Sequence, residues 1–422
     1  MLLAEIVFAT RILGLAAGEQ HVAVQVDSEV RKVEVRRNGV RVATMTAPPW
    51  RTVVDLGLEL VPQELSVIAF DANGYERGRD SQTINVAHPP AELGILLDRD
   101  DDNRVTATIR WSHFAHEDPR NVEVKLDGRV IGKGKAKSVF PLGVVDREEF
   151  HVLGVEATFP DGIRSRREVV FGGGYSEQLP AELTPVAVRQ RREASGPAKC
   201  FRSGDKRLPN ATIEDGSGSA LFILNGGRSK ARNEPPEYRT EALFRITNAE
   251  IRIVHPVAQR VEHEGGSTRL FDSNVISGIN GTQRLMMVAR TPYGIARIAD
   301  AVGSAALRAL RGGQRRVVVV VFGHDPAVDQ SINSPAVVRR YLERVGVPLR
   351  VWSLTGPRPD LADTWGEVQD VSTSAGLLAA TDELRKELDS QKLAWLPVAP
   401  LEAFRVSATA DCAYEPLAKP SS

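Results

Sequence analysis

The feature that most constrains this sequence is an internal repeat in its N-terminal part. The segment VEVRRNG at 33–39 recurs as VEVKLDG at 122–128, an offset of 89 residues. LSVIAFDANGYERGRDS at 65–81 is echoed by FHVLGVEATFPDGIRSRRE at 150–168, at nearly the same spacing. A repeat of this period predicts two tandem modules, because roughly 90–100 residues is the size of an immunoglobulin-like β-sandwich.

Hydrophobic and polar residues alternate within the first module, as they do in strands that bury one face. Such runs occupy 21–26, 32–37, 40–45 and 65–70. Asn38-Gly39 separates two of these runs and is typical of a two-residue hairpin turn. We therefore predict two tandem antiparallel β-sandwiches at 1–88 and 89–174, with His88-Pro89-Pro90 at their joint.

The pattern changes after a segment rich in Gly, Pro, Ser and charged residues. We expect residues 175–219 to form a linker with one extra strand at 182–188. Farther on, short apolar runs at 220–225, 315–322, 347–354 and 393–398 alternate with helical patterns at 295–310, 336–346 and 372–391. Strands alternating with helices predict a doubly wound α/β domain over 220–400, followed by a C-terminal tail at 401–422.

Composition excludes several classes of function. The 54 Lys and Arg balance the 54 Asp and Glu, so no global field attracts nucleic acid. No apolar stretch is long enough to predict a membrane span. The start, MLLAEIVFATRILGLAAG, does not match a signal peptide. We expect a cytoplasmic location for this chain, or an extracytoplasmic one if a segment precedes it.

The two cysteines, Cys200 and Cys412, lie 212 residues apart and outside any CxxC pair. A disulfide between them would close a very long loop and would require an oxidising compartment. We interpret them as isolated free thiols.

Three segments after residue 290 carry a family resemblance. They read IADAVGSAALRALRGGQRRVVVVVFGHD at 298–325, SPAVVRRYLERVGVPLRVWSL at 334–354, and WGEVQDVSTSAGLLAATDELRKELDSQKLAWLP at 365–397. Together they resemble the von Willebrand factor type A domain of bacterial, acidobacterial-type von Willebrand factor A-related proteins. VEVRRNGVRVATMTAPPW at 33–50 resembles the immunoglobulin-like modules that accompany it. The resemblance implies a doubly wound sheet that carries, in active members, a Mg²⁺-dependent adhesion site.

That site implies an Asp-x-Ser-x-Ser turn after the first strand of the domain. Here the strand at 220–225 runs into Asn225-Gly226-Gly227-Arg228-Ser229, so an amide replaces the leading carboxylate. Asn225 and Ser229 remain candidate binding residues. Asp215, Ser217 and Ser219 match the motif literally and are candidate metal ligands, but they precede the apolar strand instead of following it.

The other implied ligands are a threonine and a second aspartate. The threonine position aligns with Ala296, which has no hydroxyl, and the aspartate aligns with Asp325 beside His324. Adjacent side chains on a strand point to opposite faces, so His324 and Asp325 are poorly placed to share one ion. We interpret Asp325 and Asp329 as turn and helix-capping residues leading to Ser334, the predicted N-cap of the next helix.

The favoured hypothesis is a non-enzymatic binding or scaffolding protein with an unknown protein partner and no cofactor. No nucleophile elbow, zinc-binding histidine pair or glycine-rich phosphate loop occurs in the sequence. Docking would use surface shape or strand addition at a sandwich edge. One alternative retains Mg²⁺-dependent adhesion, with Asp325 and either Asp215 or Asn225 around the ion. Another is a hydrolase that uses His324 and Asp325.

Overall fold

The computed structural model divides the chain into two compact units. One comprises Met1–Glu59, Gln63–Leu179 and Arg260–Leu270, and the other Leu60–Pro62, Pro180–Gln259 and Phe271–Ser422. The structure describes residues 6–89, 91–99, 104–113, 117–145, 151–171, 183–193, 198–209, 211–225, 249–263, 266–276, 295–311, 313–323 and 326–419. None of the helices in these ranges has the length and apolar character that crossing a bilayer requires.

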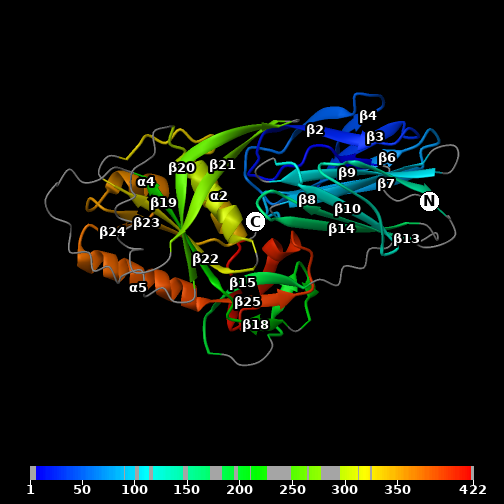
Figure 1. Cartoon of the computed structure of the whole chain (residues 1–422). Helices are drawn as coiled ribbons and strands as arrows, with labels where there is room; N and C mark the ends of the chain where they lie inside the picture. Colours follow the sequence, from blue (N-terminus) through cyan, green and yellow to red (C-terminus); the bar gives the residue numbers. More distant parts are fainter. Residues whose placement is uncertain are drawn as a thin grey trace. The chain divides into compact units, whose positions relative to one another are not determined.

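The first unit begins with an antiparallel sandwich, drawn in blue in Figure 1. Its sheets have the orders β1-β2-β5 and β4-β3-β6-β7. The strands are β1 Ile6–Phe8, β2 Glu19–Val26, β3 Lys32–Arg37, β4 Val40–Met45, β5 Arg51–Asp55, β6 Gln63–Phe70 and β7 Glu76–Ile84. All four predicted strands are present. The predicted hairpin turn is also confirmed, since Asn38 and Gly39 have φ of 50° and 81°.

A second antiparallel sandwich follows, with sheets β12-β9-β8 and β11-β10-β13-β14. Its strands are β8 Ala91–Arg99, β9 Arg104–His113, β10 Asn121–Leu126, β11 Arg129–Gly134, β12 Val139–Val144, β13 His151–Thr158 and β14 Arg164–Phe171. Asp127 and Gly128 repeat the left-handed turn of the first module. Each sandwich encloses its own cluster of buried Val, Leu, Ile and Phe side chains. The sequence repeat is therefore a structural repeat.

The second unit contains a six-stranded sheet in the order β21-β20-β19-β22-β23-β24, apart from the residues of β20 and β21 within Arg260–Leu270, which are assigned to the first unit. The strands are β19 Gly218–Asn225, β20 Ala249–His263, β21 Gly266–Ile276, β22 Arg315–Phe322, β23 Leu349–Ser353 and β24 Val368–Asp370. β19 pairs in parallel with β20 and β22, and β22, β23 and β24 are also parallel. Every residue of β19 and β22 is buried, as expected for strands covered on both faces.

Four described helices accompany this sheet: α2 Ile298–Ala309, α3 Pro335–Val345, α4 Pro359–Trp365 and α5 Ser374–Ser390. α5 buries Leu377, Leu384 and Leu388 against one face of the sheet. α2 packs on the other face (Figure 1). α3 packs against α2. The predicted N-cap of α3 is confirmed, because Ser334 Oγ accepts from Val337 N at 3.4 Å and Pro335 follows it.

The segment expected to be a linker belongs instead to a small β-structure within the second unit. Its sheets are β18-β25-β15-β27 and β17-β16-β26. The strands are β15 Thr184–Gln190, β16 Phe201–Ser203, β17 Lys206–Arg207, β18 Thr212–Glu214, β25 Gln391–Leu396, β26 Val406–Ala408 and β27 Tyr414–Pro416. The expected C-terminal tail thus supplies two strands. The run at 393–398 also differs from its expected place, since β25 pairs antiparallel with β15 and β24 takes the sixth position in the parallel sheet.

A disulfide between Cys200 and Cys412 corrects the interpretation of both cysteines as free thiols. Their Cα atoms are 5.5 Å apart despite a sequence separation of 212 residues. The pairing of β16 with β26 brings the two segments together, and Thr409 N donates to Cys200 O at 3.0 Å. Sequence distance alone gave no sign of this proximity.

Candidate functional site

The crevice outside the carboxyl ends of β19 and β22 is the place where an open α/β sheet of this order binds ligands. β19 is the first strand of the sheet and lies between β20 and β22. The chain adds β20 and β21 on one side of β19 and then crosses to add β22, β23 and β24 on the other, so the strand order reverses at β19. Asn225 ends β19 opposite Phe322, the last residue of β22. Besides these strand ends, the described residues at this edge include the start of α2 and the loop 326–333.

Asn225 holds that loop with both atoms of its amide. The residue is only 1% exposed. Its Oδ1 accepts from Ala327 N at 3.0 Å, and its Nδ2 donates to Ala327 O at 3.3 Å. An aspartate in this position could accept the first bond but not donate the second. The Asn225 amide therefore complements the backbone of Ala327, and both its oxygen and its nitrogen are already hydrogen-bonded there.

Asp329 and Ser331 cap the N-terminus of α2 from another part of the chain. The residue in the N-cap position, Arg297, makes no side-chain cap of its own. Asp329 accepts from the backbone N–H groups of Ile298 at 2.8 Å and Ala299 at 3.1 Å. Ser331 Oγ accepts from Asp300 N at 3.0 Å and donates to Asp329 at 2.6 Å. The sequence predicted a capping role for Asp329, but the helix that it caps is α2, which comes earlier in the chain.

Asp300 of α2 holds the same loop from the opposite side. Its carboxylate accepts from the backbone N–H groups of Ile332 and Asn333 at 3.0 and 3.1 Å, and from Asn333 Nδ2 at 2.9 Å. The loop and the helix start are thus joined by reciprocal carboxylate-to-backbone bonds. Asp300 and Asp329 are accordingly structural acceptors at this edge.

Asp215, Ser217 and Ser219 lie at the amino end of β19, opposite the end that carries Asn225. The eight residues of the strand separate the two ends by about 25 Å. Asp215 is exposed and forms an ion pair with Lys392, whose hydrogen bond and charge lower the pKa of the Asp215 carboxyl. Asp215 and Asn225 therefore cannot contribute to one ion site.

The remaining site predictions, Ser229, His324 and Asp325, lie outside the described residues. Ala296, at the position of the implied threonine, forms a β-bridge with Val257. Within the described ranges, no group of three or more His, Cys, Asp or Glu side chains is placed to hold a metal ion.

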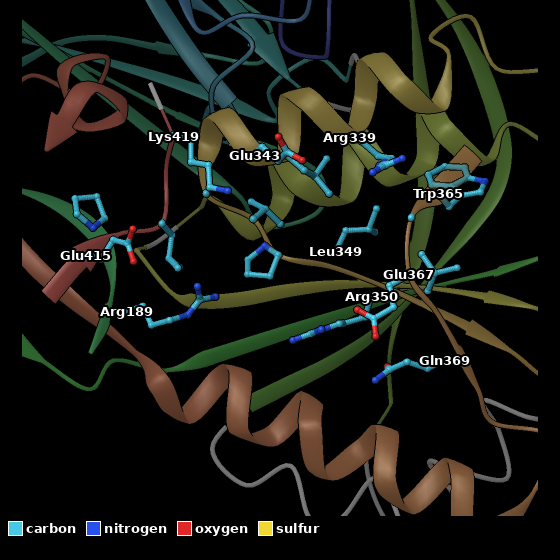
Figure 2. Close-up of a pocket in the computed structure, with 18 residues that line it drawn as sticks. Arg189, Arg339, Glu343, Leu349, Arg350, Trp365, Glu367, Gln369, Glu415 and Lys419 are labelled. Atoms are coloured by element: carbon cyan, nitrogen blue, oxygen red, sulfur yellow. The ribbon is translucent and has the colours of Figure 1, made fainter. Parts of the chain in front are cut away.

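A pocket of about 480 Å³ lies elsewhere in the second unit, and the sequence had given no indication of it. It is bounded by α3, the first half of β23, the connection from α4 to β24, and the C-terminal segment around Leu417 (Figure 2). Its volume falls within the range of roughly 300–1,000 Å³ that is usual for ligand sites. Trp365 ends α4 and lines this pocket.

Two guanidinium groups point into the pocket region from β15 and β23. Figure 2 shows Arg189 and Arg350 directed toward each other. They share one carboxylate of α5, since Glu387 lies 2.5 Å from Arg189 and 3.1 Å from Arg350. The Glu387 side chain is only 9% exposed and also accepts from Gln391 at 3.2 Å. Arg350 Nε is buried and has no hydrogen-bond partner among the described residues.

Comparison with models of known protein families found no match, and neither did a search of curated proteins. Among solved structures, fibronectin(III)-like modules of Clostridium thermocellum CbhA are 16% identical, covering 41% of this chain and 98% of theirs, with a TM-score of 0.17. The central fibronectin-III array of RIM-binding protein is 10% identical over 48% of this chain and 84% of its own, at 0.21. The BSP domain of a biofilm-associated protein is 13% identical over 41% and 30%, at 0.21. Scores this low carry no argument, so the fold rests on the strand pairing described above.

Proposed function

We propose that this chain is a non-enzymatic binding protein that combines two sandwich modules with a von Willebrand factor A-like domain. The strand order and the placement of β19 at the switch point support this assignment, because they match what the sequence resemblance implies. The observation that carries the proposal is the loop 326–333, which is hydrogen-bonded to Asn225 and to the start of α2 at the edge of the sheet where the family resemblance implies a metal. Asn225, Asp300 and Asp329 are committed there to backbone groups.

Metal binding at this edge would disrupt the loop. Mg²⁺ requires an octahedral shell of oxygens with little distortion. An ion at Asn225 would have to replace the two bonds to Ala327, and an ion at Asp329 would remove the cap of α2. Docking of a protein partner through shape and hydrogen bonds needs neither change, and we assign that role to the domain.

Thermal melting with MgCl₂ or with EDTA tests the proposal. A metal that binds only the folded protein, present at about 100 times its Kd, adds about 2.7 kcal/mol to the free energy of unfolding. We expect the same melting temperature in both buffers. A magnesium-dependent rise that Asp325→Ala abolishes would replace this proposal with metal-dependent adhesion.

The Asn225→Asp substitution sharpens the test, because it restores the carboxylate that the family motif implies. We expect it to lower the free energy of unfolding by about 1–3 kcal/mol, since a buried charge then faces the Ala327 carbonyl. Magnesium should not recover this loss. Asn38→Asp is the matched control, because the Asn38 side chain accepts from Glu64 N at 2.9 Å and donates to no group among the described residues. Full recovery of Asn225→Asp by magnesium would count against the proposal.

The disulfide supports an oxidising location for the protein, since such bonds persist outside the reducing cytosol. We therefore propose that the chain works in an extracytoplasmic compartment. Protein taken from its native source and denatured without reductant should show no thiol that reacts with a thiol-specific dye. Two reactive thiols per chain would contradict this location.

A further inference from the structure

The outer edge of β23 is only partly covered by β24. The pairs run from Val351 with Val368 to Ser353 with Asp370, and Leu349 and Arg350 have no partner in this register. Gly366, at φ 92°, turns the chain away just before β24 begins. The first half of β23 therefore borders the pocket of Figure 2 as an open strand edge.

The backbone groups of Leu349 point toward this open edge. Val318 N donates to Pro348 O at 2.9 Å, and Leu354 N donates to Phe322 O at 2.9 Å. The backbone N–H and C=O groups of the even-numbered residues of β23 therefore point toward β22. Alternation along a strand then turns the N–H and C=O of Leu349 outward, on the side where Ser353 O accepts from Val371 N at 2.9 Å. Outward groups of this kind form the template for strand addition.

Side chains of an added strand would meet two different surfaces. Figure 2 shows Leu349 directed toward α3 and Arg350 directed toward α5. A residue paired with Leu349 lies on the α3 side, near Trp365, because paired residues share a face. Its two neighbours in the added strand lie on the other side, near Arg350 and Arg189.

Charge distinguishes these two surfaces. Among the pocket's basic side chains, Arg339 and Lys419 balance the acidic Glu343 and Glu367. The acidic Glu415 is paired with Arg191 at 2.6 Å.

Arg189 and Arg350, by contrast, share the single carboxylate of Glu387, which leaves one positive charge in excess. Because Arg350 Nε is also buried without a partner among the described residues, this side is suited to a further carboxylate.

We propose that this pocket docks an extended acidic segment of a partner protein, which adds to β23 in line with β24. The segment alternates apolar residues, packed against Leu349 and Trp365, with Asp or Glu facing Arg350 and Arg189. This inference rests on the proposed docking function and names its surface and the chemistry of the partner. It places strand addition on the α/β sheet, whereas the sequence had suggested a sandwich edge.

Fluorescence anisotropy with labelled peptides tests the inference on the full chain. The acidic probe is the heptapeptide TVEVEVT, acetylated and amidated, and its counterpart is TVKVKVT. We expect the acidic peptide to bind about tenfold or more tightly than the lysine peptide, with an affinity that falls as salt rises. Two acidic peptides N-methylated on alternate backbone nitrogens complete the set. The one whose methyl groups face β23 should not bind, and the one whose methyl groups face away should still bind. Equal affinity of the two unmodified peptides, or equally tight binding of the two methylated ones, would overturn the inference.

Two variants assign the contacts. Leu349→Pro removes an outward N–H without removing a bond to β22, and Arg350→Gln removes the guanidinium. Each should weaken the acidic peptide by about tenfold, the loss of one charge-assisted or backbone hydrogen bond. Arg385→Gln, an arginine of α5 that is 44% exposed and pairs with Asp382, is the matched control and should bind as the parent does. Melting curves establish that each variant is folded.

The outcomes separate this inference from the function on which it rests. Unchanged binding in Arg350→Gln, or no binding of the acidic peptide to the parent chain, would refute docking at β23 and leave the proposed metal-independent binding function standing. A magnesium-dependent rise in melting temperature would refute the proposed metal-independent function, independently of the result of the peptide assay.

Discussion

Gly346 ends α3 at a position where a single added methyl group has a large effect. Its φ of 65° lies in the left-handed region. A Cβ there would come within 2.5 Å of Ala418 N and 2.7 Å of Leu417 C. The glycine thus serves both the helix end and the close approach of the C-terminal segment that lines the pocket.

Gly346→Ala should lower the free energy of unfolding by about 2 kcal/mol or more, as measured by chemical denaturation. About 1 kcal/mol reflects the left-handed backbone, and the rest reflects displacement of the C-terminal segment. Gly356→Ala separates the two, because Gly356 has φ 89° but nothing within 4 Å of its Cβ position. An equal loss in both variants would mean that the C-terminal segment does not pack on Gly346.

Asn225 shows what could be predicted for single residues. Its place at the end of a buried strand was visible in the sequence, and so was an amide where the family resemblance implies a carboxylate. Its partner Ala327 lies 102 residues farther along the chain. No local pattern encodes that distance, so the pairing of Asn225 with this loop became visible only in the folded chain.

At the scale of elements, α2 depends on a cap from outside its own sequence. Asp329 lies 31 residues after Ile298, the first residue of the helix. Asp329→Ala should lower the free energy of unfolding by about 1–2 kcal/mol, because two N–H groups of the first turn and the Ser331 hydroxyl lose their acceptor. Urea denaturation provides the measurement. Asp329→Asn keeps one acceptor oxygen and should lose less, and an equal loss would show that the cap is not the cause.

His88, between β7 and β8, forms a hydrogen bond with Glu92 of β8. His88 Nδ1 lies 2.8 Å from a Glu92 carboxylate oxygen. Burial raises the pKa of Glu92, but the hydrogen bond to His88 and the charges of His88, Arg11 and Arg167 outweigh it and lower the pKa from its ordinary value of 4.5. The charged carboxylate is therefore favoured in the folded protein.

A carboxyl whose pKa is lowered by folding stabilises the protein above its unfolded pKa and loses this effect as pH falls through the folded value. The melting temperature of the parent should therefore exceed that of Glu92→Gln by a constant amount between about pH 5 and 6, and the gap should close below about pH 4.5. Glu64→Gln, which alters an exposed carboxylate of β6, is the control. A gap that widens in acid would contradict the proposed pairing.

For the whole molecule, repeated and periodic features were predictable and long-range pairings were not. The 89-residue repeat predicted both sandwiches, and the apolar run at 315–322 predicted β22. The run at 393–398 was assigned to the wrong sheet because a short apolar strand does not specify its partner. The strand in this run, β25, pairs with β15 through six residue pairs, from Thr184 with Leu396 to Arg189 with Gln391.

The Cys200–Cys412 disulfide is a covalent link between distant segments of the second unit, and its removal tests the two-unit organisation. It closes a loop of 212 residues in the unfolded chain, so its loss should destabilise the second unit by about 2–5 kcal/mol. Calorimetry of the Cys200→Ser, Cys412→Ser double variant should show one transition at lower temperature. The transition of the two sandwiches should not move, because neither cysteine belongs to their unit. A fall in both transitions would mean that the units unfold together, and no fall would mean that β16 and β26 hold the segments without the covalent bond.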